Sequence, residues 1–187
     1  MGFWQSHPVH RMSENFSVLP PPLQEFAEVK TYPKGHRLVE QDKVGQHIFH
    51  ILSGSCRLFY YQDSREITSW FAFENEAITS SSFFSRQPGA ESVETLEPAT
   101  VIQMSYEKQQ ALFAKYPEAE RYVRLQQEQL IIRLEQRLKG LLFQTARDRY
   151  EHLLWVFPAI MLRVPHHMIA SYLGITPETL SRMRAVR

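Results

Sequence analysis

The sequence predicts an α+β protein with three consecutive parts: a β-rich N-terminal part, one long helix and a small helical C-terminal part. Between residues 35 and 105, short runs of β-branched and aromatic residues are separated by turn residues at intervals of roughly 8–12 residues. Residues 118–143 contain apolar residues at helical spacing and no proline. The stretch 164–187 contains the start and stop signals of two short helices. With 187 residues, of which 43% are hydrophobic, the chain is long enough to bury a packed core.

Five runs in the β-rich part have the length and composition of strands. They are residues 47–52, 56–61, 66–73, 92–96 and 99–104. Several short strands with turn residues between them are typical of a β-sandwich or a barrel-like domain. In the third run, alternation predicts that one face carries Ile67, Ser69, Phe71 and Phe73 and the other carries Thr68, Trp70 and Ala72.

A long helix is predicted from Glu118 to about Phe143. Its apolar positions form a narrow stripe, Val123, Leu130, Leu134, Leu138 and Leu141, which is widened by Ile131, Ile132 and Leu142. The charged residues between them are expected on a solvated flank: Arg124, Glu128, Arg133, Glu135 and Arg137. A helix of about 26 residues is about 39 Å long, which exceeds one side of a small β domain. The stripe therefore predicts packing against the same helix of a second subunit. The alternative is a long core helix folded onto its own chain.

Shorter helices are predicted on either side of this one. Ser105 is a suitable N-cap for a helix that runs through Phe113. A further helix is predicted over residues 145–157, ended by Pro158.

Charge is distributed unevenly along the chain. Residues 1–132 carry 12 Lys/Arg and 16 Asp/Glu, whereas residues 133–187 carry 9 Lys/Arg and 4 Asp/Glu. A polyanion would bind the basic C-terminal third, because neutralising phosphates releases condensed counterions. The alternative is two solvated surfaces of opposite sign.

Several protein classes are excluded by what the sequence contains. The single cysteine, Cys56, cannot form an internal disulfide, and its apolar neighbours predict a buried, inert thiol. No apolar run approaches the roughly 18 residues of a membrane span, and no N-terminal segment resembles a signal peptide, so we expect a cytoplasmic protein.

Catalytic and metal-binding patterns are missing as well. His47 and His50 are three residues apart in one predicted strand, so they point to opposite faces and cannot hold a metal together. No glycine loop for phosphates and no nucleophile elbow is present. We therefore predict neither an enzyme nor a metal site.

Residues 165–184 carry the strongest functional signal. A short amphipathic helix is predicted from the apolar residues Met168, Ile169, Tyr172 and Leu173. Gly174 follows where a left-handed conformation is needed. Thr176 is a good N-cap for a second helix, and Pro177 suits its first position. The carboxylate of Glu178 interacts favourably with the positive N-terminal end of the helix dipole. Two short helices joined by a tight turn with glycine predict a helix-turn-helix.

The second helix of such a motif contacts base edges with its N-terminal residues. Glu178 and Arg182 are four residues apart and so share one face. Arg182 has the donors to bind guanine, and Glu178 has the acceptors for the amino group of cytosine. Further residues are expected at the DNA backbone or at additional bases: Thr176, Thr179, Ser181, Arg184 and Arg187. The alternative is that Glu178 only caps the helix and the arginines are solvated.

Over about residues 18–187 the chain resembles the Crp/Fnr superfamily of bacterial transcription regulators. Residues 35–41 (GHRLVEQ) and 48–54 (IFHILSG) resemble the opening of a cyclic-nucleotide-binding-like β-roll. Residues 171–182 (SYLGITPETLSR) resemble the helix-turn-helix of the family, and Glu178 and Arg182 match its base-contacting Glu and Arg. Pro177 replaces the Arg that precedes them in the family, which puts the phosphate contacts and sequence preference of the family in doubt here.

The resemblance implies a division of the chain and a set of partners. The implied parts are a jelly-roll-like β-roll sensor domain at 1–116, a dimerisation helix at 117–143 and a helix-turn-helix domain at 144–187. It also implies a homodimer on double-stranded DNA, RNA polymerase as a partner and a small-molecule effector. A β-wing is not expected, because the sequence ends at Arg187.

The sensor segment departs from the pattern of cyclic nucleotide binders. These proteins use a Gly-Glu-apolar segment and then an Arg before a small residue; here Ser80 stands at the Glu position and Gly89 at the Arg position, with Arg86 three residues earlier. Without that cation a phosphodiester would be desolvated unpaired, which disfavours cyclic AMP as the effector. The candidate pocket for another polar ligand consists of Thr79, Ser80, Ser81, Ser82 and Arg86. The alternative is that the hydroxyl residues belong to a solvated loop.

Three functional hypotheses follow from these patterns. The first is a ligand-responsive DNA-binding regulator. The second is a DNA-binding regulator whose sensor no longer responds to a ligand. The third is a sensor or protein-interaction module that does not bind DNA. The basic C-terminal third disfavours the third hypothesis.

Overall fold

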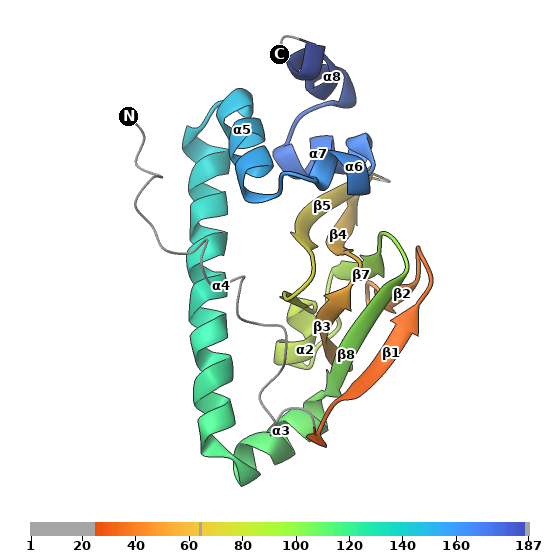
Figure 1. Cartoon of the computed structure of the whole chain (residues 1–187), viewed down its shortest axis with the longest axis vertical. Helices are drawn as coiled ribbons and strands as arrows, with labels where there is room; N and C mark the ends of the chain where they lie inside the picture. Colours follow the sequence, from red (N-terminus) through yellow and green to blue (C-terminus); the bar gives the residue numbers. More distant parts are fainter. Residues whose placement is uncertain (1–24, 64, 186–187) are drawn as a thin grey trace.

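The computed structural model describes residues 25–63 and 65–185. The first 24 residues of the predicted sensor part and Arg187 lie outside the described residues. The strands form one lobe, the long helix α4 runs along its side, and helices α5 to α8 gather at one end (Figure 1). The α+β class and the order of its parts are as predicted.

Two four-stranded antiparallel sheets form the β-rich part. Their strand orders are β1-β8-β3-β6 and β2-β7-β4-β5. The strands are β1 (Glu28–Tyr32), β2 (Arg37–Val39), β3 (His47–Ser53), β4 (Cys56–Gln62), β5 (Arg65–Ala72), β6 (Ala77–Ile78), β7 (Glu91–Thr95) and β8 (Ala99–Ser105). All five predicted strands are present, whereas β1, β2 and β6 were not predicted from the sequence.

The inner faces of the two sheets enclose an apolar core. Phe49, Ile51 and Val101 from the first sheet and Cys56 and Val93 from the second are almost wholly buried in it. Removal from water raises the pKa of the Cys56 thiol to about 12. The predicted burial of Cys56 is therefore confirmed, and its thiol is un-ionised at neutral pH.

A β-bulge in β5 overturns the predicted alternation of that strand. Leu58 lies opposite Trp70, but the next residue of β4, Phe59, lies opposite Thr68, so Ser69 is the extra residue. Thr68 and Phe71 therefore share a face, although we predicted them on opposite faces. That face is turned toward the C-terminal helices, because the Phe71 ring packs against Tyr172 of α7.

Seven helices are described, and their local sequence explains most of their ends. They are α2 (Ser81–Ser85), α3 (Tyr106–Lys115), α4 (Pro117–Phe143), α5 (Ala146–Val156), α6 (Ile160–Arg163), α7 (His166–Leu173) and α8 (Pro177–Ala185). The predicted cap of α3 is confirmed, because the Ser105 side chain accepts from the Lys108 amide. Thr145 and Asp148 form a capping box at the start of α5. Helices α2 and α6 were not predicted.

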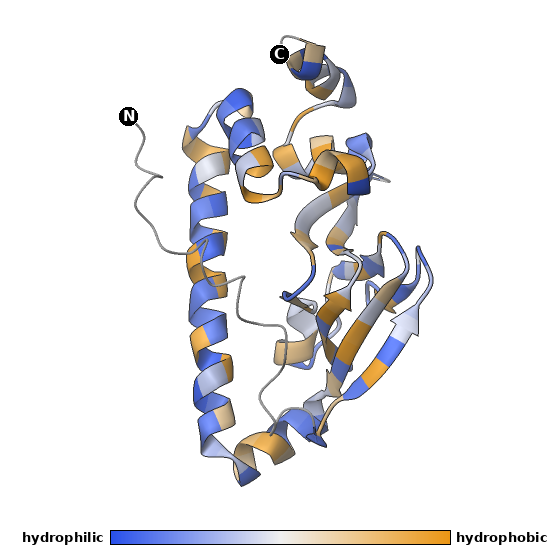
Figure 2. Ribbon diagram, viewed as in Figure 1, coloured by the Kyte–Doolittle hydropathy of each residue, from blue (hydrophilic) through white to orange (hydrophobic). Residues whose placement is uncertain are grey.

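Helix α4 buries little of its apolar surface within the chain. Only Ala119 and Gly140 of its 27 residues are buried. Leu134, Leu138 and Leu141, three positions of the predicted stripe, are 48%, 56% and 42% exposed. Apolar residues recur along the whole helix (Figure 2). The apolar stripe is therefore not covered by the described residues of its own chain.

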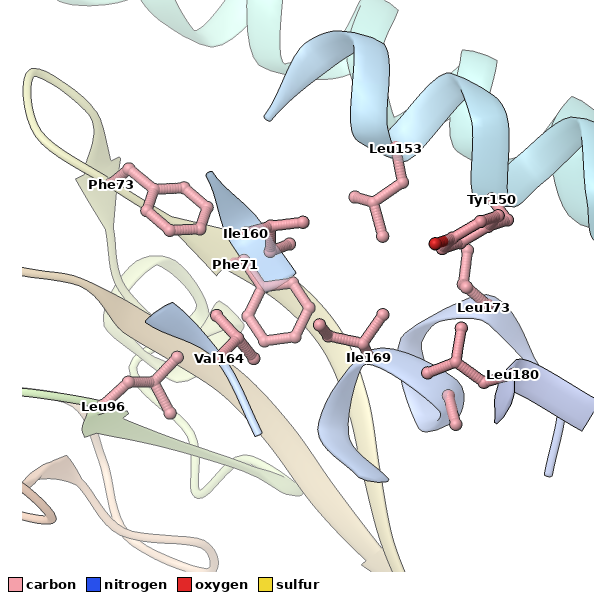
Figure 3. Packing of buried hydrophobic residues seen from close by; sticks show 11 residues of the cluster. Phe71, Phe73, Leu96, Tyr150, Leu153, Ile160, Val164, Ile169, Leu173 and Leu180 are labelled. Carbon is pink, nitrogen blue, oxygen red and sulfur yellow. The ribbon is translucent and has the colours of Figure 1, made fainter. Parts of the chain in front are cut away.

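The C-terminal helices share a hydrophobic core with the β-roll. Phe71, Phe73 and Leu96 from the β-roll are buried in one cluster with residues of α5, α6, α7 and α8 (Figure 3). The helical members are Tyr150, Leu153, Ile160, Val164, Ile169, Ala170, Leu173 and Leu180. Burying this much apolar surface together holds the helices against the β-roll.

Candidate nucleic-acid interface

Helices α7 and α8 are joined by a tight turn whose geometry follows from three residues. Gly174 has φ 68° and ψ 35°, the left-handed conformation predicted for it. The Ile175 amide donates to the Ala170 carbonyl at 3.0 Å, which closes the end of α7. The Thr176 hydroxyl accepts from the Thr179 amide at 3.2 Å, so the predicted cap of α8 is confirmed.

One side of α8 is buried and the other is exposed. Leu180 is 1% exposed in the shared core, and Met183 packs against the same cluster. The predicted DNA-contacting residues Thr176, Glu178, Ser181, Arg182 and Arg184 are exposed, and Thr179 is half-buried. Helix α8 lies at one end of the molecule, away from the β-roll (Figure 1). The structure therefore places all six predicted residues on one helix and its cap.

The charged groups of α8 have few partners within the described residues. The backbone amide of Glu178 and the Thr176 side chain lower the pKa of the Glu178 carboxyl, with a smaller effect from Arg182. The Arg182 guanidinium lies 3.4 Å from the Thr179 hydroxyl, to which it donates. Arg184 Nη1 lies 3.1 Å from Nδ1 of His166, at the start of α7. Glu178 and Arg182 thus present an ionised acceptor and a cationic donor side by side.

The predicted effector residues bind one another and the backbone around α2. Ser80 and Ser82 are buried and share a hydrogen bond, and Ser82 Oγ accepts from the Gly45 amide at 2.9 Å. Thr79 donates to the His47 carbonyl at 2.9 Å, and Ser81 donates to Glu91 Oε2 at 2.8 Å. The structure brings Ser80 and Ser82 together but gives Thr79 and Ser81 other partners.

Arg86 is also held by the protein itself. It has a left-handed backbone (φ 55°) and donates to the Gly45 carbonyl at 2.8 Å. Its guanidinium lies 4.6 Å from the centre of the Tyr106 ring, a cation–π distance. Gly89 packs so closely on α2 that an added Cβ would lie 2.9 Å from the Ser82 Cβ. The polar groups of this segment therefore already have partners in the protein.

Two small cavities, of about 80 and 170 Å³, lie elsewhere. The first is lined by α5 and α8 residues and the second by Phe73 and residues of the α5–α6 region. Within the part of the chain that the structure describes, no three His, Cys, Asp or Glu side chains gather closely enough for a metal ion. None of the described helices has an apolar stretch of the length needed to span a bilayer.

Two arginines of α4 were wrongly assigned to a solvated flank, because one binds α7 and the other binds the β-roll. Arg137 of α4 is half-buried: it donates to the Tyr172 carbonyl at 2.9 Å and lies 3.6 Å from the centre of the Tyr172 ring. Burial lowers the pKa of Arg137. Arg133 pairs with Glu76 of the β-roll at 2.6 Å. The last carbonyls of a helix have no partner within it, so the predicted end of α7 was the one sign in the sequence that a donor such as Arg137 would lie nearby.

Arg149 of α5 completes the support at the same helix end. Its Nε donates to the Leu173 carbonyl at 3.0 Å, and its Nη1 donates to the Gln144 carbonyl at 2.7 Å. Helices α4 and α5 thus both bind the C-terminal end of α7, just before the turn that leads to α8.

Comparison with known proteins matches nearly half of the chain to a family model. Residues 29–116 match the model of the cyclic nucleotide-binding domain. Among curated proteins, none matches the sequence.

Solved structures resemble almost the whole chain. FixK2 from Bradyrhizobium japonicum has a TM-score of 0.73 at 16% identity, with 86% of this chain and 83% of FixK2 covered. CLP from Xanthomonas campestris, described as a c-di-GMP-responsive global regulator, has a TM-score of 0.70 at 18% identity, with 88% of each chain covered. The catabolite activator protein of Thermus thermophilus has a TM-score of 0.56 at 21% identity, with 91% of this chain and 84% of that chain covered. Likeness at these identities establishes a shared fold.

Two neighbouring serines test whether the α2 segment is held together from within. Ser82→Ala removes the acceptor of the buried Gly45 amide, so we expect a loss of about 1–3 kcal/mol in the free energy of unfolding. Ser81→Ala removes only an exposed hydrogen bond and should change it by less than about 0.5 kcal/mol. Urea unfolding measures both values. Equal, small effects would show that the α2 segment does not depend on this internal bonding.

Proposed function

Because residues 29–116 form a cyclic nucleotide-binding domain and the chain has the fold of the Crp/Fnr regulators, we propose that it is a transcription regulator that binds double-stranded DNA as a homodimer. The proposed division is the one that the resemblance implies: a sensor domain at 1–116, a dimerisation helix at 117–143 and a helix-turn-helix domain at 144–187. We also propose RNA polymerase as a partner.

The observation that carries this proposal is the two-sided character of α8. Its apolar side is buried by Leu180, while Glu178 and Arg182 are exposed in the first two turns. In a helix-turn-helix these turns of the second helix enter the major groove. The turn at Gly174 and the support of α7 by α4 and α5 hold α8 in a fixed direction.

We assign the contacts of α8 by the chemistry of each side chain. Arg182 donates to O6 and N7 of a guanine, and Glu178 accepts from the amino group of a cytosine. Thr176, Thr179, Ser181 and Arg184 bind phosphates or further base edges. Arg184, near the C-terminal end of α8, lies beside His166 at the start of α7, and we assign this arginine to the DNA backbone.

The exposed stripe of α4 supports the proposed dimer. A 27-residue helix is about 40 Å long, and its leucines lie uncovered along the side of the molecule. An apolar patch of this size on a helix marks an interaction surface. Two copies that pack along α4 bring two α8 helices to one side of the dimer, as two half-sites one DNA turn apart require.

The sensor of this regulator does not need cyclic AMP in our proposal. The segment that would bind the cyclic phosphate has Ser80 and Gly89 at the two key positions, and Arg86 is bonded to the protein itself. An effector of another kind would have to displace these internal hydrogen bonds. The free energy lost when these hydrogen bonds break would weaken the binding of that effector.

Arg182→Ala tests the base contact. Loss of one bidentate guanine contact should weaken binding to the preferred DNA by about 1–3 kcal/mol, roughly 5- to 150-fold, and leave most of the binding to random DNA intact. Fluorescence anisotropy with labelled duplexes, at fixed salt, measures both affinities. Arg124→Ala is the matched control, because Arg124 is exposed at the far part of α4 and pairs with Glu128. Equal loss on all sequences would show that Arg182 touches only phosphate.

Leu138→Glu tests the dimer. A carboxylate in the middle of the α4 contact would be buried without a partner, so the dissociation constant of the dimer should rise by more than about 100-fold. Light scattering at micromolar concentration measures the mass of each variant. Leu162→Glu is the control, because Leu162 is 91% exposed on α6 and lies off the stripe. A wild-type monomer, or a dimer that Leu138→Glu leaves intact, would contradict the α4 interface.

A further inference from the structure

Arg163, the last residue of α6, binds two carboxylates of the β-roll at once. Its Nη1 and Nη2 donate to the two oxygens of Glu74 at 2.8 and 2.7 Å, and its Nε donates to Glu97 Oε1 at 3.0 Å. The Arg163 hydrogen bonds lower the pKa of Glu74 more than any other cause. We call these three residues the Arg163 cluster. It joins the helical end of the molecule to the β-roll through four hydrogen bonds from one planar guanidinium.

The two carboxylates of the Arg163 cluster are themselves tied to a third turn of the β-roll. Glu74 Oε1 accepts from the Gly54 amide at 3.0 Å, and Glu97 Oε1 accepts from the Ser55 hydroxyl at 2.6 Å. Gly54 and Ser55 lie between β3 and β4, Glu74 follows β5, and Glu97 precedes β8. One guanidinium therefore binds two turns of the β-roll directly and is linked through their carboxylates to a third.

Ser171 of α7 makes a second polar contact, this time with the edge of a sheet. Its hydroxyl accepts from the Thr68 amide at 2.9 Å and donates to the Glu66 carbonyl at 3.1 Å. Strand β5 is the last strand of its sheet, so these backbone groups have no strand beside them. Ser171 thus supplies the donor and the acceptor that a neighbouring strand would supply.

Arg57 of β4 binds the segment of β5 that Ser171 contacts. Arg57 is 2% exposed; it donates to Glu94 Oε1 at 2.7 Å and to the Thr68 hydroxyl at 3.3 Å, and it also binds the Glu66 carboxylate. A buried arginine with all these partners fixes the strand on which α7 rests. The contact made by Ser171 is therefore with a rigid part of the β-roll.

We infer that Arg163 and Ser171 are positioning residues that set the direction of α8 by fixing α6 and α7 to the β-roll. Only three residues separate α7 from α8, and both helices bury side chains in the same cluster, so α8 follows α7. The inference rests on the proposed function, in which α8 contacts DNA. It adds that the turns of the sensor domain, and not the end of α4 alone, determine where that helix points.

Amide hydrogen exchange of the full chain tests the inference without DNA. Arg163→Lys keeps the charge but loses the bidentate bond to Glu74, and Ser171→Ala leaves the Thr68 amide without its acceptor. We expect exchange in β5 and α7 to become faster by on the order of tenfold in either variant, with α3 unchanged. Arg147→Lys is the control, because Arg147 pairs with Glu151 inside α5. Unchanged exchange in β5 and α7 in both variants would overturn the inference.

Salt provides the same test on the wild-type protein. The side chains of the Arg163 cluster are about a third exposed, so their attraction is partly screened by ions. Raising the salt from about 0.1 M to about 1 M should speed exchange in α7 more than in α3. An equal response in the two helices would count against the Arg163 cluster as a support of α7.

Selection of DNA from a random pool tests whether the contacts of Arg163 affect the DNA sites that the protein binds. The wild type should select two half-sites at one spacing, whereas Arg163→Lys should select the same half-sites over a wider range of spacings. A merely structural residue would lower the affinity without widening that range, and this result would overturn the role in positioning α8. If exchange responds as expected but the wild type selects no DNA, the proposed function fails while the role of Arg163 and Ser171 in holding α7 stands.

Discussion

Phe71 of strand β5 and Ile169 of helix α7 are buried in one cluster, together with Leu173 and Leu180. This contact joins the outer face of a sheet to the helices that follow α4. Beside it, Ser171 of α7 binds backbone groups at the edge of β5, and the Phe71 ring enters the core from the face of the same strand. A helix of eight residues is not stable alone, so α7 depends on this packing for its stability.

The exposed features of the molecule follow from the same arrangement. Because α7 packs on the β-roll and α8 packs on α7, the polar side of α8 is left facing solvent with Glu178 and Arg182. Helix α4 contributes Arg133 and Arg137 to the body of the chain, so its leucines face outward. A surface for DNA and a surface for a second copy are thus consequences of one packing scheme.

The sequence alone predicted what depends on neighbours along the chain. Helix caps at Ser105 and Thr176, the left-handed Gly174 and the main strands are local, and the structure has them. The bulge at Ser69 was missed because its pairing depends on β4. Arg137 was placed on a solvated flank because its partner, the Tyr172 carbonyl, comes from a distant segment. Arg163 and Ser171 were missed for the same reason. For the site, five of the six residues predicted on α8 and its cap are exposed and Thr179 is half-buried, whereas the hydroxyls around α2 could not be assigned to internal bonds without the fold.

Sequence-specific DNA binding that does not depend on cyclic AMP is tested by measuring the binding of the full chain to double-stranded DNA with and without cyclic AMP. Fluorescence anisotropy on duplexes selected from a random pool, with excess competitor DNA, separates specific from general binding. We predict that the chain binds the selected duplexes in the presence of competitor DNA and that cyclic AMP leaves the affinity unchanged. Binding that competitor abolishes for every selected duplex would contradict a sequence-specific regulator. Binding that appears only with cyclic AMP would contradict our reading of the α2 segment.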